Sequence, residues 1–135
     1  MDPFLKAAID EARLGISEGG IPIGSRGHNR RVQQGSAILH GEMDALENAG
    51  RHPASVYRES TLYTTLSPCS MCSGAILLYG IPKVIVGENK TFMGEENWLR
   101  SKGVEIEVVN NTECIEMMET FIREKPGLWN EDIGE

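Results

Sequence analysis

The sequence predicts an α/β fold in which a parallel or mixed sheet lies between layers of helices. The 135 residues, 40% of them hydrophobic, fit one globular domain with an apolar core. From residue 41 onward, stretches with helical periodicity alternate with short runs rich in β-branched residues. Such alternation is typical of strands joined by helical crossovers. No apolar run approaches the roughly 20 residues that a membrane-spanning helix requires.

The first helix is predicted to begin at Asp2, which can cap it, with Pro3 at the first helical position. Apolar residues recur at spacings of three and four as far as Ile16, and a Gly-Gly pair then ends the helix. The next segment, 21–29, is too short and too rich in glycine for a full strand. It predicts a strand stub and a turn.

The later elements are defined by their periodicity and by proline and glycine at their ends. Pro68 opens one helix and Gly80 stops it, as these residues do at helix termini. The predicted helices cover about 41–48, 69–79, 95–102 and 112–125, and the predicted strands cover 61–65, 83–87 and 104–109. The remaining tail, 126–135, places Trp129 and Ile133 among acidic residues.

Charge and cysteine content limit the partners and the compartment. Lys and Arg number 13 against 20 Asp and Glu, and the net charge of -7 disfavours a large polyanion such as nucleic acid. A local run of Arg26, Arg30 and Arg31 can bind phosphate, although scattered surface arginines are the more common explanation. Three cysteines without a visible export signal favour reduced thiols and a cytoplasmic protein.

One imidazole and two thiols form a candidate metal site. His40 lies just before a predicted helix, and Cys69 and Cys72 lie at the start of another. This is the N and S ligand set that tetrahedral zinc prefers, and three protein ligands leave one position for water. Residues three apart share a helix face, and the positive end of the helix dipole helps to hold both thiols as thiolates.

Glu42 is the candidate proton carrier. In a regular helix, His40 and Glu42 point about 200° apart, so both face one metal only if His40 occupies an irregular start to the helix, where Gly41 gives the backbone freedom. Zinc lowers the pKa of bound water to about 7, and a free carboxylate nearby can accept its proton.

Simpler interpretations exist for each part of this site. A lone C-x-x-C pattern also fits a closed structural zinc site or a redox pair, and a lone histidine is more often half-buried without a special role. A structural site needs a fourth Cys or His, and the other histidines are His28 and His52. Cys114 lies on the apolar face of a predicted helix and is expected to be a core residue. A structural site also has no use for Glu42.

At these residues the sequence resembles the cytidine deaminase-like superfamily, whose zinc enzymes carry H-x-E and P-C-x-x-C. Beyond this motif it is similar to the cytosine deaminases of fungi and bacteria. The matching segments are 18–24, 26–29, 35–42, 62–69, 80–82, 86–89 and 129–135. They span nearly the whole chain, and the last segment is more specific than the zinc motif.

The resemblance implies a three-layer α/β/α sandwich with a central mixed sheet, assembled as a homodimer. It implies one Zn²⁺ per subunit on His40, Cys69 and Cys72. With Glu42 as the proton shuttle, a zinc-activated water would convert cytosine to uracil and release ammonia. The nearest alternative is a tRNA adenosine deaminase or another base deaminase with the same ligands, and the acidic net charge argues against the tRNA enzyme. A zinc-stabilised interaction domain without catalysis is an alternative of another class.

The resemblance also assigns the substrate contacts. Asn29 and Asp132 would hydrogen-bond the pyrimidine, which suits a small base that must be selected by paired polar groups. The other implied contacts are the backbone at Gly41 and Leu66 and the pocket-closing side chains of Phe92, Trp129 and Ile133. Without the resemblance, Asn29 would be interpreted as a turn-forming residue and Asp132 as a solvated charge in the tail. Trp129 would be interpreted as an aromatic residue that packs the tail against the body of the protein.

The chain departs from the family at one junction. The resemblance implies a β-hairpin between Ser25 and Arg26, which requires about a dozen residues that are absent here. Loss of two strands would expose apolar helix faces and leave Asn29 poorly anchored, at a cost that a marginally stable domain hardly tolerates. We therefore expect one domain, 1–135, whose natural form carries further residues at this junction.

Overall fold

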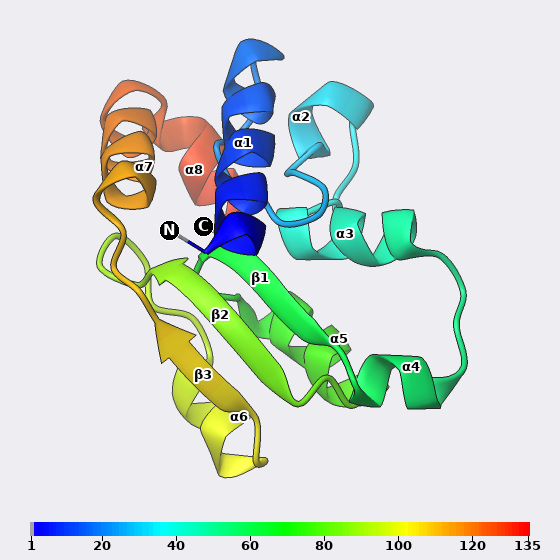
Figure 1. Ribbon diagram of the computed structural model, residues 1–135. Coiled ribbons are helices and arrows are strands. Elements are labelled where there is room, and N and C mark those ends of the chain that lie inside the picture. Colours follow the sequence, from blue (N-terminus) through cyan, green and yellow to red (C-terminus); the bar gives the residue numbers. More distant parts are fainter. Residues whose placement is uncertain (1) are drawn as a thin grey trace.

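The computed structural model describes residues 2–135, and its centre is a three-stranded parallel sheet. The strands lie in the order β1 (Thr61–Leu66), β2 (Lys83–Glu88) and β3 (Glu105–Val108). Helices α5 (Ser70–Tyr79) and α6 (Glu96–Ser101) connect them and cover one face, and α1 (Pro3–Ser17) and α7 (Thr112–Glu124) cover the other (Figure 1).

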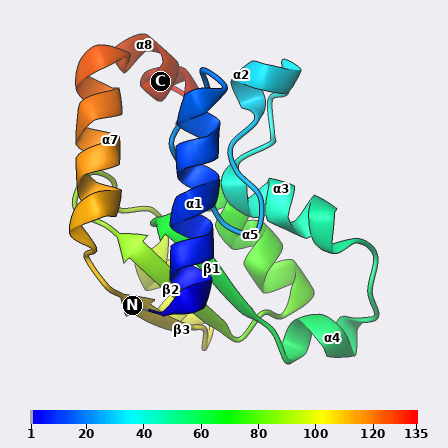
Figure 2. The same ribbon diagram turned by 45° about the horizontal axis from the view of Figure 1, so that its top comes forward.

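Four further helices lie around this sandwich. Helix α7 leads into α8, which turns back toward α1 and α2 (Figure 2). The short helices are α2 (Arg31–Gln34), α3 (Gly41–Ala49), α4 (Ala54–Arg58) and α8 (Pro126–Asp132). None of the helices described in 2–135 is long and apolar enough to cross a membrane.

Two apolar layers hold the helices to the sheet. On one face, Val84 and Val86 of β2 pack with Ile76 of α5 and Leu99 of α6. On the other, Leu5 and its neighbours on α1 pack with residues of α7 and with Tyr63 of β1. Because β2 is covered on both sides, its residues from 84 to 88 are all buried, as expected for the central strand of a parallel sheet.

The predicted elements from residue 41 to 125 are confirmed, with ends that shift by a residue or two. The side chain of Asp2 accepts a hydrogen bond from the backbone N–H of Phe4 at 2.8 Å, so the predicted cap of the first helix is confirmed. The α/β layering is also confirmed. The mixed sheet is not seen in the described residues: all three strands are parallel, and the antiparallel pairing is a single bridge between Gly24 and His28.

That bridge closes the chain at the junction where the family hairpin was expected. The N–H of Ser25 donates to the carbonyl of Gly27 at 2.7 Å, and the N–H of Thr65 donates to the carbonyl of Gly24 at 2.9 Å. Segment 24–28 therefore covers only one end of the outer edge of β1. Asn29 is fully buried all the same, so the anticipated loss of its anchorage is not observed.

The side chain of His28 connects this turn to α1 by contacting two carboxylates. Its Nδ1 lies 2.7 Å from Glu11 Oε2 and its Nε2 lies 2.7 Å from Glu18 Oε1. Burial lowers the pKa of His28, but the hydrogen bonds to Glu11 and Glu18 outweigh burial and raise the pKa above its usual value. Arg30 and Gln33, which act on Glu18, are the other polar groups facing this cluster.

The cluster gives a pH-dependent contribution to stability. Because the pKa of His28 is higher in the folded than in the unfolded protein, protonated His28 stabilises the fold fully below about pH 6.5 and progressively less as the pH rises through the folded pKa. The difference in unfolding free energy between the wild type and His28→Gln should therefore be larger at pH 6 than at pH 9 in urea titrations. The exposed His52→Gln is the control for removal of a histidine outside this cluster. A constant difference for His28→Gln would contradict this account.

Candidate metal centre

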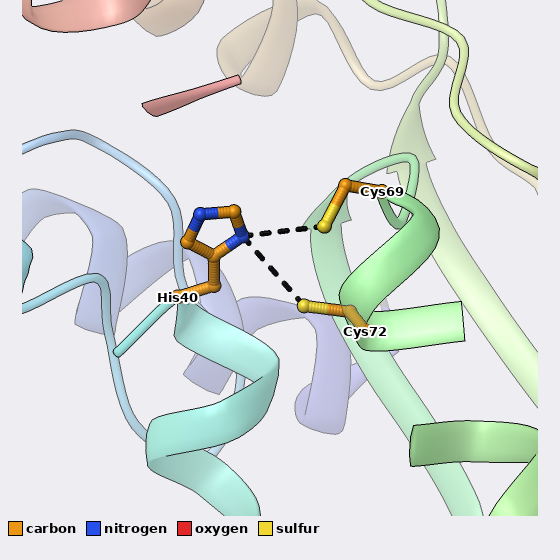
Figure 3. A group of neighbouring side chains, drawn as sticks. All are labelled: His40, Cys69 and Cys72. Carbon is orange, nitrogen blue, oxygen red and sulfur yellow. Dashed lines mark hydrogen bonds between the residues drawn. The ribbon is translucent and has the colours of Figure 1, made fainter. Parts of the chain in front are cut away.

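Three potential metal ligands converge between α3 and α5. His40 Nδ1 lies 3.4 Å from Cys69 Sγ and 3.7 Å from Cys72 Sγ. All three ligand atoms lie within 4.8 Å of one another, and the imidazole points at both sulfurs (Figure 3). A soft N and S donor set at this separation fits a zinc ion at its centre. Three protein ligands leave a tetrahedral position open.

Two helix starts position these ligands. His40 is the N-cap of α3 and has an extended backbone, with ψ 162°. Cys69 is the N-cap of α5, and Cys72 lies in its first turn. The predicted irregular start at His40 is therefore confirmed. A Cβ on Gly41 would lie 3.2 Å from the carbonyl oxygen of Ile23, so glycine lets the two segments approach closely.

The protonation states of the three ligands depend on one another. A hydrogen bond from Cys72 lowers the pKa of Cys69 to about 4, and the hydrogen bond to Cys69 together with burial raises the pKa of Cys72. Burial lowers the pKa of His40, but the hydrogen bond with Cys69 and the charge of Asp132 outweigh it and raise the pKa to about 9. The thiolate character of Cys69 suits metal binding, which replaces the remaining protons.

Glu42 faces the same cavity as His40 and Cys69 and is 4% exposed. Burial raises the pKa of its carboxyl to about 7, against the opposing charge of His40. A group with this pKa can both accept and return a proton near neutral pH. The structure thus brings Glu42 to the metal ligands, as expected if His40 lies outside the regular helix.

A small, partly open cavity lies over these residues. Its volume is about 10 Å³, close to the space of one water molecule. Phe92 and Trp129 form part of its wall, with ring centroids 5.6 Å apart at an interplanar angle of 78°. The lining residues are Ile23, His40, Glu42, Leu66, Ser67, Cys69, Phe92, Trp129, Asp132 and Ile133. Six residues expected at the site therefore meet here around the ligands: Glu42, Leu66, Phe92, Trp129, Asp132 and Ile133.

The remaining expected residues lie just behind the cavity. Asn29 Nδ2 donates to Asp132 Oδ1 at 3.0 Å, and both side chains are buried. Cys72, itself one of the three ligands, is fully buried, and Gly41 packs against Ile23. Cys114 is a core residue, as expected, and burial raises the pKa of its thiol to about 12.

Sequence reasoning missed Ile23 and Ser67. Ser67 directly follows β1, and its hydroxyl donates to the buried carboxylate of Glu96 at 2.5 Å and accepts from the N–H of Gly94 at 2.9 Å. These two hydrogen bonds connect the end of β1 to the loop that carries Phe92. The carboxyl ends of parallel strands commonly carry ligand sites, which is the signal that would have pointed to Ser67.

Residues 6–88 match the model of the cytidine and deoxycytidylate deaminase zinc-binding region, which is more than half of the chain. The chain belongs to this deaminase family. His40, Cys69 and Cys72 form its zinc site.

The deaminase resembles several characterised relatives. It is 57% identical over 142 residues to a cytosine deaminase of Candida albicans, and the match covers 97% of this chain and 95% of the relative. It is 34% identical to a tRNA-specific adenosine deaminase of Streptococcus pyogenes, over 90% of this chain and 89% of the relative. Among solved structures, a guanine deaminase of Nitrosomonas europaea has the same fold, with a TM-score of 0.68 at 20% identity over 86% of this chain and 81% of that chain.

Proposed function

We propose that this deaminase hydrolyses cytosine to uracil and ammonia. The observation that carries the proposal is the open three-ligand zinc site with Glu42 lining the same small cavity. The substrate class is supported by 57% identity, over nearly the full length of both chains, to a protein named cytosine deaminase.

His40, Cys69 and Cys72 would hold the zinc through one nitrogen and two sulfurs. Zinc, when bound there, supplies a Lewis acid that lowers the pKa of a coordinated water to about 7. The carbonyl of Asp132 lies 3.1 Å from His40 Nε2, so it can accept the N–H of the nitrogen that faces away from the sulfurs. This contact fixes the tautomer and orientation of the imidazole, as outer partners of ligating histidines generally do.

Glu42 carries protons between the attacking water and the base. Its carboxylate would accept one proton from the attacking water and pass it to the ring nitrogen. It would then accept the second proton from the new hydroxyl on the attacked carbon and pass it to the departing amine, so that the C=O bond of uracil forms as the C–N bond breaks and ammonia leaves. A pKa of about 7 makes both directions accessible at neutral pH. This role requires that Glu42 line the cavity without being a metal ligand, and it is outside the three-residue ligand cluster.

The polar pair of Asn29 and Asp132 selects the base. Asp132 lines the cavity, and Asn29 supports it from behind at 3.0 Å. Backbone groups at Gly41 and Leu66 supply further polar contacts, while Phe92, Trp129 and Ile133 close over the flat ring. A ligand that lacks the matching groups would leave buried polar atoms unpaired, which is the strongest source of discrimination for so small a substrate.

Deamination of a tRNA adenosine is the second candidate, because tRNA-specific relatives align over 90% of the chain. Electrostatics disfavour it. The net charge is -7, and two arginines of the local basic run are engaged: Arg30 lies 3.5 Å from Asp44, and Arg31 lies 3.3 Å from Asp132. Neither is a free phosphate-binding group.

A substrate panel tests the proposed function. The zinc-loaded protein is mixed in turn with cytosine, cytidine, adenine, guanine and a tRNA anticodon stem, and ammonia or inosine is followed. Cytosine should be turned over roughly 5- to 150-fold faster than the others, because one unsatisfied buried polar group costs about 1–3 kcal/mol. Turnover of the RNA in preference to cytosine would replace this proposal with the second candidate.

We further propose that the chain is a single domain lacking an edge hairpin between Ser25 and Arg26. Both residues line a groove of about 550 Å³ beside the outer edge of β1, where Phe4 and Val56 expose 55% and 43% of their surface. The alignment with the Candida albicans relative spans 142 residues, more than this chain contains, so several positions of that relative have no counterpart here.

Restoring those residues should stabilise the protein. Inserting the corresponding segment of the Candida albicans relative between Ser25 and Arg26 should raise the midpoint of thermal unfolding by roughly 5–10 °C, because it would cover the groove and pair the edge of β1. A Gly/Ser insert of equal length is the control and should not raise it. An equal midpoint for both inserts would show that the groove is not an unfilled part of the fold.

We propose a homodimer and a cytoplasmic location. The dimer is supported by exposed apolar side chains on α4 and α5, where Val56, Leu78 and Tyr79 are 43%, 74% and 42% exposed. The location is supported by three free cysteines in the described residues. Light scattering should give the dimer mass, and Leu78→Lys should shift it to the monomer.

A further inference from the structure

Arg31 joins three segments that are distant in the sequence. Its Nη1 lies 3.3 Å from Asp132 Oδ1, its Nη2 lies 3.7 Å from Glu131 Oε1, and its Nε donates to the carbonyl of Ala37 at 2.9 Å. The Arg31 side chain is 13% exposed and that of Asp132 is 2% exposed. A largely buried, charge-assisted contact of this kind is stronger than a surface ion pair.

Asp132 connects α8 to the site through polar contacts. Its carboxylate accepts from Asn29 and Arg31, and its carbonyl lies 3.1 Å from His40 Nε2. Within residues 2–135, the polar side-chain contacts from α8 to the N-terminal half pass through Glu131 and Asp132. Helix α8 also carries Trp129, which closes the cavity.

The cavity has room for about one water, far less than the several hundred Å³ of a typical ligand pocket. A base can enter only when part of the wall moves. Phe92 is held from the other side by a tightly bonded loop, in which the buried Glu88 accepts from the backbone N–H groups of Lys90 and Thr91 at 2.8 and 2.9 Å. On the opposite side, Trp129, Asp132 and Ile133 of α8 and its C-cap form part of the wall.

We propose that Arg31 is a positioning residue that fixes the carboxylate of Asp132 and thereby docks α8 over the pocket. The guanidinium acts through Asp132 and does not line the cavity itself. Its planar fork meets Asp132 and the carbonyl of Ala37 at once, and Ala37 lies three residues before His40. Arg31 thus sets the distance between the closing helix and the segment that leads to the metal ligand. The kinetic part of this inference rests on the proposed function.

The test compares Arg31→Gln and Arg31→Lys with the neighbouring Arg30→Gln, which removes the contact with Asp44 and the charge that acts on Glu18. Hydrogen–deuterium exchange is measured on the zinc-loaded protein. In Arg31→Gln, amides of α8 should exchange roughly tenfold faster, because a hydrogen bond to a charged group is lost, while those of α3 and α5 stay unchanged. Arg31→Lys keeps the positive charge but loses the planar guanidinium group. The exchange rate of α8 amides in Arg31→Lys should therefore lie between those of the wild type and Arg31→Gln. Arg31→Lys also replaces Arg31→Gln as the test variant if Arg31→Gln does not fold.

The kinetic readout separates positioning from general destabilisation. In Arg31→Gln, KM for cytosine should rise roughly tenfold with a smaller change in kcat, because the base contact is misplaced and the proton carrier is intact. Unchanged exchange in α8, or an equal effect of Arg30→Gln, would overturn the proposal. If the wild type does not turn over cytosine, the proposed function fails, whereas the exchange result still decides the role of Arg31.

Discussion

Replacement of Glu42 by glutamine is expected to lower kcat for cytosine by about 10²–10⁴-fold, because general acid–base catalysis contributes a factor of this size. The amide keeps the size of the side chain but cannot carry a proton between water and base. Glu42 is not among the three clustered ligands, so zinc content should stay at that of the wild type. Ammonia release and metal analysis on the same sample measure both quantities.

Glu47→Gln is the matched control, because Glu47 lies exposed on the same helix and does not line the cavity. It should leave kcat within about twofold, as expected for a surface substitution. Loss of zinc together with activity in Glu42→Gln would show that Glu42 supports the metal site. Full activity in Glu42→Gln would exclude it as the proton carrier.

Asp132→Asn is expected to lower kcat/KM by about 10²–10³-fold, since removing one partner of a buried ion pair costs 3–5 kcal/mol. The substitution removes the negative charge that Asn29 and Arg31 share, and it presents an amide N–H₂ to groups that are themselves donors. Steady-state kinetics with cytosine measure the effect, and circular dichroism shows whether the fold is retained.

The neighbouring acid gives the control for this substitution. Glu131 is 66% exposed and contacts Arg31 only at 3.7 Å, so Glu131→Gln should change kcat/KM by less than about threefold. Similar losses in both variants would mean that overall charge near the C terminus, not the buried carboxylate, governs catalysis.

The metal centre was predictable because the signals for it lie in short stretches of sequence. Cys69 and Cys72 are separated by about one helical turn, and Pro68 and Gly41 mark in the sequence where α5 and α3 begin. The requirement that His40 lie outside the regular helix followed from the angle between helical positions. The structure meets it with an extended residue at the N-cap.

The parts that escaped prediction depend on contacts between distant segments. Ser67 is an ordinary residue after a strand until Glu96 and Gly94 come to it from beyond β2. The link from Arg31 to Asp132 spans 101 residues and has no periodic signal. Helices α2, α4 and α8 have four, five and seven residues, too few for a helical period to stand out.

The type of sheet was inferred from the family resemblance and not from the residues. A mixed sheet needs an antiparallel edge, and in this chain the segment after Ile23 forms a tight turn in place of such strands. The alternation of helices and strands after residue 41 is compatible with a parallel or a mixed sheet, and the described residues contain the parallel one.

The central claim, an open three-ligand zinc site with a separate proton carrier, is tested most directly by X-ray absorption at the zinc edge and a crystal structure of the zinc-loaded protein. The account expects one nitrogen at about 2.0–2.1 Å, two sulfurs at about 2.3 Å and a fourth ligand that is water. Glu42 should lie within about 3 Å of that water without touching the metal. A fourth protein ligand on the zinc, whether Glu42 or any other side chain, would contradict the account.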